Sequence, residues 1–257
     1  MMLRILLAGL ALAACLAQGA DRLVNIETRP GVKVGYYWME RPGAKATIVL
    51  LPGGEGGIGM KDGTPHSENF LVRSRDYFAE AGFNVAVVGK PSDRNDLDAR
   101  FRSTDEHVAD LRAVVQKLSG FGQPIWLVGT SLGTISAAAA ASAQPPLPIA
   151  GIVLTSSVTG TNRYTGFSVP MLDLAQVRVP VLVMHHKDDS CDVCEPGQAH
   201  RIVEALTNAP VKKLLLVSGG SMFPTGPPCQ AHHHHGYIGM EKEAAGYITS
   251  WIANPTP

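Results

Sequence analysis

The chain has 257 residues with 22 acidic and 22 basic side chains, so its net charge is zero. Hydrophobic residues make up 45% of it and charged residues 17%, proportions that exclude a disordered chain and suffice for one sizeable core. No block of like charge marks a nucleic-acid partner or an anionic membrane surface, and neither is expected.

Residues 1–20 have the pattern of a secretory signal. A basic residue near the start precedes an almost wholly apolar stretch over residues 5–17, which is shorter than the about 20 residues of a membrane span. Cleavage after Gly19 or Ala20 would release a soluble protein. The segment Leu-Ala-Ala-Cys ending at Cys15 resembles a bacterial lipobox, which would instead leave a lipid-modified cysteine. We therefore expect an exported protein, periplasmic or secreted, that is attached to a membrane only if this cysteine is lipidated.

The elements expected after this segment follow from the periodicity of apolar residues. Residues 23–28 and 32–39 alternate around a Pro-Gly pair and predict a β-hairpin. Further along, short apolar runs alternate with segments of helical periodicity. In chain order we expect a strand at 46–51, a helix at 68–81, strand 84–88, helix 105–118, strand 124–128, helix 132–143, strands 149–155 and 180–185, helix 198–207, strand 211–217 and a helix at 238–253.

Continuous apolar strands that alternate with helices predict a mostly parallel central sheet with helices on both faces. Residues 21–257 contain no internal repeat or linker, so we expect one α/β domain. Only about 25 residues separate the strand ending at 155 from the one beginning at 180, which is too few for a large cap domain.

One motif points to chemistry. The strand at 124–128 runs into Gly-Thr-Ser-Leu-Gly, residues 129–133, and then directly into a helix. A GxSxG motif between a strand and a helix is the nucleophile elbow, in which the glycines allow a tight turn and close backbone approach. We therefore expect the Ser131 hydroxyl at the carboxyl end of a central strand. A serine hydroxyl is a poor nucleophile at neutral pH, so it needs a base and an acid that orients the base.

Candidates for both partners follow later strands. The strand at 180–185 leads into His-His-Lys-Asp-Asp, which ends at Asp189, and the strand at 211–217 leads into a loop that ends in four histidines, 232–235, before the last helix. The order of serine, acid and histidine along the chain is that of the α/β-hydrolase arrangement.

The elbow, the strand leading to HHKDDSC and the HHGY before the last helix resemble the α/β-hydrolase superfamily across essentially the whole mature chain. More closely, FLVRSRDYFAEAGFNVAVVGKPSD, LVGTSLGTISAA and the loop from Cys229 to His235 resemble a group of exported bacterial α/β-hydrolase-like proteins of undefined substrate. The resemblance implies the α/β-hydrolase fold, with His235 as base and Asp189 as acid. Asp188 is the near alternative to Asp189, and Asp192 is a more distant one.

The loop at 52–57 reads Pro-Gly-Gly-Glu-Gly-Gly and resembles the His-Gly-Gly type, with Pro52 where histidine is common. The expected oxyanion hole combines the backbone N–H of Leu132 with that of Gly54, and Glu55 is the next candidate. The implied reaction is two-step acyl transfer, in which Ser131 attacks an ester or amide carbonyl and water releases the acyl-enzyme. No cofactor is expected.

Export permits disulfides, and three cysteines, Cys191, Cys194 and Cys229, remain beyond the signal. A bridge between Cys191 and Cys229 would tie the acid loop to the base loop, and Cys194 is the alternative partner. The four adjacent histidines lack the spacing of metal motifs, so polar loop contacts are expected there and no metal. His107 on a predicted helix is expected to be a surface or capping residue.

The sequence as a whole predicts a serine hydrolase of carboxylesterase type that acts on a small-molecule ester or amide. Three alternatives stay open: a small peptidase or amidase, a catalytically silent envelope protein that binds a ligand on the same fold, and a histidine-rich metal-binding protein. The sequence identifies neither the substrate nor the oligomeric state.

Overall fold

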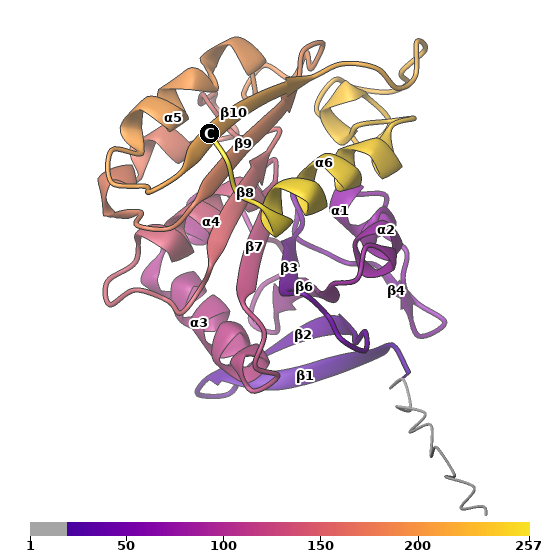
Figure 1. The fold of residues 1–257 in the computed structure, drawn as a ribbon, viewed down its shortest axis with the longest axis vertical. Coiled ribbons are helices and arrows are strands. Elements are labelled where there is room, and N and C mark those ends of the chain that lie inside the picture. The colour runs from indigo at the N-terminus through magenta and orange to yellow at the C-terminus, as the bar shows by residue number, and fades with distance from the viewer. Residues whose placement is uncertain (1–19) are drawn as a thin grey trace, which may run out of the picture.

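The computed structural model describes residues 20–257, so the predicted signal up to residue 19, with Cys15, lies outside the described residues. Its centre is an eight-stranded sheet with strand order β1-β2-β6-β3-β7-β8-β9-β10 (Figure 1). The strands are β1 (Arg22–Arg29), β2 (Val32–Met39), β3 (Thr47–Leu51), β6 (Asn84–Pro91), β7 (Ile125–Thr130), β8 (Gly151–Thr155), β9 (Val181–His186) and β10 (Lys212–Val217). The β1–β2 and β2–β6 pairs are antiparallel and the other pairs are parallel, which confirms the predicted hairpin and the mostly parallel sheet.

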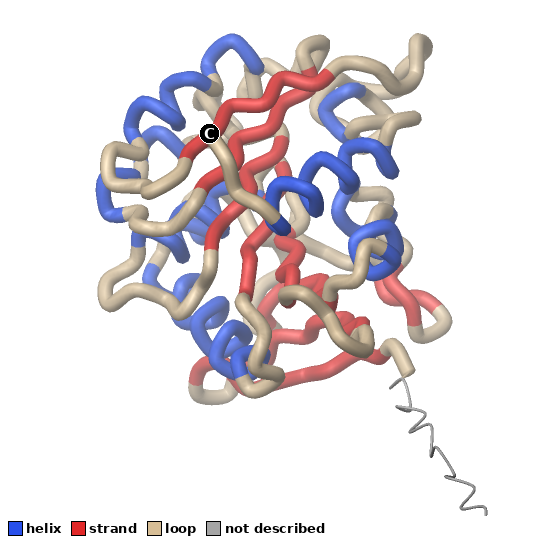
Figure 2. Tube along the Cα trace, viewed as in Figure 1, coloured by secondary structure: helices blue, strands red, loops and turns tan. Residues whose placement is uncertain are grey.

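Helices cover both faces of the sheet: in Figure 2 the blue helices lie on either side of the red strands. One face carries α3, α4 and α5, and the other carries α1, α2 and α6 (Figure 1). The helices are α1 (Phe70–Arg73), α2 (Arg75–Glu80), α3 (Asp105–Ser119), α4 (Gly133–Ser142), α5 (His200–Ala205) and α6 (Glu241–Ala253). Within residues 20–257, no helix combines the length and apolar character needed to span a bilayer.

The apolar strand runs are explained by burial from two sides. In β3 all five residues are buried, and they alternate between the two core clusters: Val49 and Leu51 face the α3–α4 side, whereas Ile48 and Leu50 face the α1–α6 side. Because both faces of the strand are covered, no polar position is needed along it. The same holds for β7, so the segment that leads to Ser131 is a central strand of the sheet.

The helix expected at 68–81 is divided at Ser74 into α1 and α2. Phe70, Leu71 and Val72 are buried in α1, and Phe78 is buried in α2. Both short helices therefore pack against the same core cluster.

Two further segments differ from expectation. The loop after β3 contains a small hairpin, β4 (Met60–Lys61) with β5 (Thr64–Pro65), that has no clear apolar alternation. The last helix begins at Glu241 and not at 238, because Gly239 has a φ of 75°, which is incompatible with a helix.

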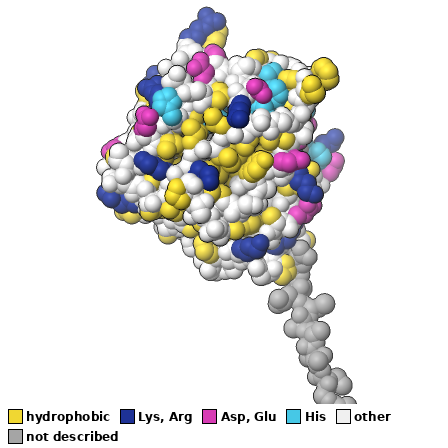
Figure 3. Space-filling view, turned by 45° about the horizontal axis from the view of Figure 1, so that its top comes forward, with side chains coloured by type: hydrophobic (Ala, Val, Ile, Leu, Met, Phe, Trp, Pro, Cys, Tyr) yellow, Lys and Arg dark blue, Asp and Glu magenta, His cyan; other side chains and the backbone are white. Residues whose placement is uncertain are grey.

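The connection from β8 to β9 contains only two short 3-10 turns, Val169–Met171 and Leu174–Gln176, so no large cap domain lies over the described sheet. On the face shown in Figure 3, basic and acidic side chains are interspersed around an apolar band. This distribution agrees with the balanced charge of the sequence.

Candidate active site

Ser131 lies in the turn between β7 and α4, in the backbone conformation that an elbow requires. Its φ is 53°, in the left-handed region, and its N–H donates to the Thr155 carbonyl of the neighbouring strand at 3.0 Å. A Cβ on Gly129 would collide with the carbonyl of Gly133, and a Cβ on Gly133 would collide with the carbonyl of Leu51. Both glycines of the GxSxG motif are thus required for steric reasons, because α4 starts directly against β7 and β3.

His235 and Asp189 are in direct contact, although 46 residues separate them. Nδ1 of the imidazole lies 2.9 Å from Oδ2 of Asp189, and the other carboxylate oxygen accepts the backbone N–H of Cys191 at 3.0 Å. Asp188 instead has an exposed carboxylate and donates its N–H to His186. Of the two adjacent aspartates, Asp189 is therefore the one that orients the ring.

His235 lines a cavity. Nε2 is buried and has no hydrogen-bond partner in the described part of the chain. The cavity has a volume of about 530 Å³. Its walls include Gly53, Gly54 and Glu55 after β3, Ser131 and Leu132 after β7, Cys191 and Asp192 after β9, and Cys229 and His235 before α6. The structure thus brings the predicted serine and histidine to one cavity at the carboxyl ends of the parallel strands.

Two backbone N–H groups at this cavity are available to a ligand. Across residues 20–257, the N–H groups of Gly54 and Leu132 have no acceptor within the protein. Leu132 precedes the first turn of α4, where N–H groups and the helix dipole favour negative charge. These are the two donors that the sequence assigned to an oxyanion hole, and both border the cavity that Ser131 borders.

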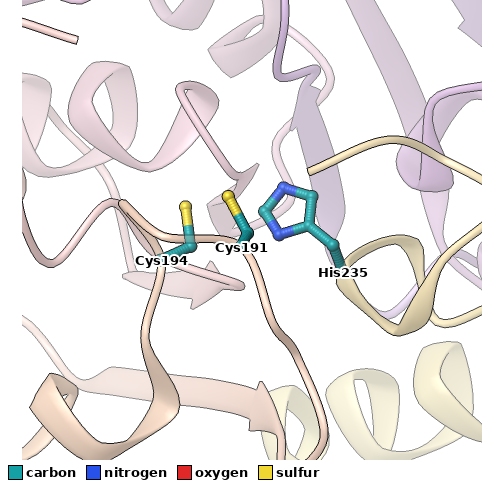
Figure 4. Close-up of side chains that lie close together, drawn as sticks. All are labelled: Cys191, Cys194 and His235. Atoms are coloured by element: carbon teal, nitrogen blue, oxygen red, sulfur yellow. The ribbon is translucent and has the colours of Figure 1, made fainter. Parts of the chain in front are cut away.

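A disulfide joins Cys191 to Cys229, the pairing favoured from the sequence. It links the loop that carries Asp189 to the loop that carries His235. Cys194 is a buried free thiol whose sulfur lies within 4.8 Å of the Cys191 sulfur and a nitrogen of His235 (Figure 4). Burial raises the pKa of the Cys194 thiol well above its usual value, so the group stays protonated and uncharged.

Arg73 anchors the base loop from the opposite side. Its guanidinium donates to the Gly236 carbonyl at 2.6 Å and the Ala231 carbonyl at 3.1 Å, and it pairs with Glu241 at 3.0 Å. Its side chain is largely covered, because the loop before α6 packs against α1. His235 is therefore held by the disulfide on one side of its loop and by Arg73 on the other.

His107 is also not a surface residue: it is 4% exposed, and its Nε2 lies 2.8 Å from the Ser136 hydroxyl. The contact arises because α3 packs against α4 and Ser136 supplies a polar partner within that interface. Burial lowers the pKa of His107 to about 3, so the ring is neutral at physiological pH.

The remaining histidines near the site make structural contacts. His186 and His234 stack with ring centroids 4.5 Å apart and an interplanar angle of 7°. With Asp188 they offer ligand atoms within 4.8 Å of one another, but lone pairs of two stacked parallel rings lie in separate planes and do not converge on one ion. His234 lies near the carbonyls of Ser221 and Asp188, at 3.0 and 3.3 Å. Cys191 and Cys194 are the two sulfur atoms near His235 that could bind a metal, and the Cys191 sulfur is already bound in the disulfide.

Comparison with known proteins supports the fold. No family model matches the sequence, and no curated protein matches it significantly. Among solved structures, an esterase from Pyrococcus furiosus matches at 14% identity with a TM-score of 0.65, covering 91% of this chain and 90% of that one. A dienelactone hydrolase from Anabaena variabilis matches at 15% identity with a TM-score of 0.62, covering 91% and 97%. A cold-adapted esterase from an Arctic intertidal metagenomic library matches at 17% identity with a TM-score of 0.60, covering 90% and 93%. The chain therefore has the α/β-hydrolase fold.

Proposed function

We propose that this protein is a serine hydrolase that cleaves a carboxylic ester or an amide of a small molecule. Ser131 is the nucleophile, His235 the general base and Asp189 the acid that orients it. The observation that carries the proposal is the placement of the His235 ring: Nδ1 lies 2.9 Å from Asp189, Nε2 has no hydrogen-bond partner among the described residues, and His235 lines the same cavity as Ser131. A ring held in this way has its free nitrogen available for the serine proton.

The reaction proceeds in two steps. Ser131 attacks the carbonyl carbon while His235 takes the hydroxyl proton, and the same proton then passes to the leaving alcohol or amine. Water attacks the resulting acyl-enzyme with His235 again as base, which releases the acid and regenerates the serine. Asp189 stabilises the imidazolium that forms in each step. Its second oxygen is occupied by the Cys191 N–H, which keeps the carboxylate from rotating away from the ring.

The negative charge that develops on the carbonyl oxygen is stabilised by the N–H groups of Gly54 and Leu132. Both groups lack an acceptor in the described chain, so no existing hydrogen bond has to break when the oxyanion forms. Loss of one such donor typically raises the barrier by about 2.7–4 kcal/mol. The esterases and hydrolases with the same fold are consistent with this chemistry.

We further propose that the protein acts outside the cytoplasm. The signal-like residues 1–20 and the disulfide beside the candidate site both support this. The N-terminal sequence of protein recovered from the periplasm or medium tests it. A mature chain that begins after residue 19 or 20, or at a lipidated Cys15, is expected, whereas an uncleaved cytoplasmic chain would contradict it.

Steady-state kinetics on 4-nitrophenyl esters and the corresponding anilides test the reaction. Wild type is expected to turn over short esters, and Ser131→Ala and His235→Ala are each expected to lower kcat by about 10⁴-fold or more. Ser119→Ala, on the exposed side of α3, is the matched serine control and keeps full activity. Faster cleavage of anilides than of esters would favour the amidase form. No turnover of either class by folded protein would refute the proposal and favour a ligand-binding role.

A further inference from the structure

Arg102 is a buried cation beneath the loop that follows β3. It lies in a 3-10 turn, Phe101–Ser103, and is 1% exposed. No carboxylate in residues 20–257 lies within salt-bridge distance of it. Burial of a charge is unfavourable unless hydrogen bonds replace those to water. The acceptors around the guanidinium therefore show which parts of the chain this side chain holds in place.

Those acceptors belong to the two segments that flank the candidate nucleophile. Nη2 donates to the carbonyls of Pro52 and Gly54 at 3.1 and 3.0 Å, in the loop after β3. Nη1 donates to the hydroxyl of Ser136 at 3.0 Å, in the helix that begins directly after the elbow. Nε donates to the Leu97 carbonyl at 2.8 Å. One planar group therefore connects the loop that carries Gly54 to the helix behind Leu132.

Four consecutive carbonyls of the loop, those of residues 52–55, are held by hydrogen bonds, and the guanidinium donates two of these bonds. The carbonyls of Pro52 and Gly54 accept from it. The Gly53 carbonyl accepts from the Gly56 N–H at 3.1 Å, and the Glu55 carbonyl accepts from the Leu97 N–H at 3.0 Å. Because a trans peptide is planar, a carbonyl held in one direction holds the N–H of the next residue in the opposite direction. The N–H groups along this loop consequently have defined orientations.

The loop needs such support for two reasons. Gly54 and Gly56 have φ values of 55° and 76°, and glycine backbone is free to leave these conformations when nothing holds it. The loop also touches the nucleophile, since a Cβ on Gly53 would lie 2.7 Å from Cβ of Ser131. A small rotation of one peptide plane would therefore move a donor relative to the serine.

We infer that Arg102 is a positioning residue that holds the two peptide planes on either side of the one that carries the Gly54 N–H, and ties them to the helix that begins after Leu132. It thereby keeps the Gly54 and Leu132 N–H groups in register, and its positive charge favours the oxyanion they bind. The side chain does not border the cavity that contains Ser131 and is separated from it by the loop peptides. It contacts those peptides and not the substrate. The inference rests on the proposed function, because the loop serves catalysis only if Ser131 is acylated.

Two variants separate charge from geometry. Arg102→Lys retains the charge but not the planar fork, and Arg102→Met removes both. The matched control is Arg112→Lys, because Arg112 also donates to two backbone carbonyls, those of Pro145 and Pro146, far from the loop. Measured on a neutral 4-nitrophenyl ester, kcat is expected to fall about 10- to 100-fold in Arg102→Lys and further in Arg102→Met. KM should change by less than about threefold.

A second readout distinguishes positioning from a merely structural role. A trifluoromethyl ketone adds to the serine and places an oxyanion at the two N–H groups, so its affinity should fall by the same factor as kcat. Circular dichroism and thermal unfolding establish that each variant is folded. If both Arg102 variants fail to fold, Ser136→Ala decides the question. It removes the hydroxyl that the guanidinium shares with His107, and should lower kcat and ketone affinity together, with KM unchanged.

The possible failures are distinguishable. A folded Arg102→Lys variant with wild-type kcat and ketone affinity would overturn the inference and leave the proposed function intact. The same conclusion follows if Ser136→Ala has the kcat and the ketone affinity of the wild type. Wild-type protein that cleaves no ester or anilide would overturn the proposed function, and the inference with it.

Discussion

Removal of the disulfide is expected to weaken both the stability and the activity of the protein. The variant is Cys191→Ala with Cys229→Ala, in which the buried Cys194 is the one cysteine left in residues 20–257. Because the bridge spans 38 residues, the chain-entropy estimate of its contribution is about 4 kcal/mol. For a chain of this length that corresponds to a fall in Tm of about 8–16 °C.

The effect on activity follows from what the bridge connects. Asp189 and His235 lie on loops that the disulfide ties together, and the Cys191 N–H binds the Asp189 carboxylate directly. Arg73 still anchors the base loop to α1 in the double variant. We therefore expect kcat to fall by about tenfold rather than to vanish, since Asp189 and His235 are both still present and only their relative position is less fixed.

Thermal unfolding and ester kinetics with and without dithiothreitol measure both effects. Wild type should lose stability and activity on reduction, whereas the double variant should not respond. Cys194→Ala retains the bridge and serves as the control that still responds. A double variant with the Tm and kcat of oxidised wild type would refute the reasoning, because the loops would then hold their positions without the bridge.

Three other predictions follow. Gly53→Ala should lower both stability and kcat, because the new Cβ would lie 2.7 Å from Cβ of Ser131. The control Gly197→Ala, whose new Cβ would meet open space, should behave as wild type. Equal stability and kcat in the two variants would contradict this. Burial lowers the pKa of His107 to about 3, against about 6.5 in an unfolded chain. The folded state therefore keeps the ring neutral, and its free energy of unfolding falls as the pH drops from about 6.5 to 3, where the unfolded chain binds a proton and the folded one does not. In urea unfolding, the free energy of unfolding that is lost between pH 7 and 5 should be smaller by about 2 kcal/mol in His107→Gln than in wild type. Identical losses in the two proteins would contradict the prediction. Cys194 should resist thiol reagents in native protein and react once the chain is denatured, and rapid native reaction would contradict its burial.

The features that the sequence predicted correctly are those with local signals. The strand at 46–51 is a continuous apolar run, and the elbow at 129–133 is a contiguous motif between a strand and a helix, so both are recognisable without tertiary information. The Cys191–Cys229 pairing was favoured because each cysteine lies close in sequence to one of the predicted partners of Ser131.

The features that the sequence did not predict depend on distant contacts. Arg102 lies 50 residues from Pro52, and Arg73 lies 163 residues from Gly236, so the local sequence does not identify the partners of either arginine. His107 is buried for a similar reason, because its partner Ser136 is on another helix. One signal was present: Arg102 follows directly after Phe101 in an expected loop, and a cation beside apolar residues in a loop that must cover a core is a candidate for burial.

The most direct test of the central claim is the site of covalent modification by a fluorophosphonate. Intact mass followed by peptide mapping should show one adduct, at Ser131. The adduct should be absent in Ser131→Ala, strongly slowed in His235→Ala and unchanged in Ser119→Ala. Folded wild-type protein that forms no adduct, or forms it at another residue, would contradict the assignment of Ser131 as an activated nucleophile.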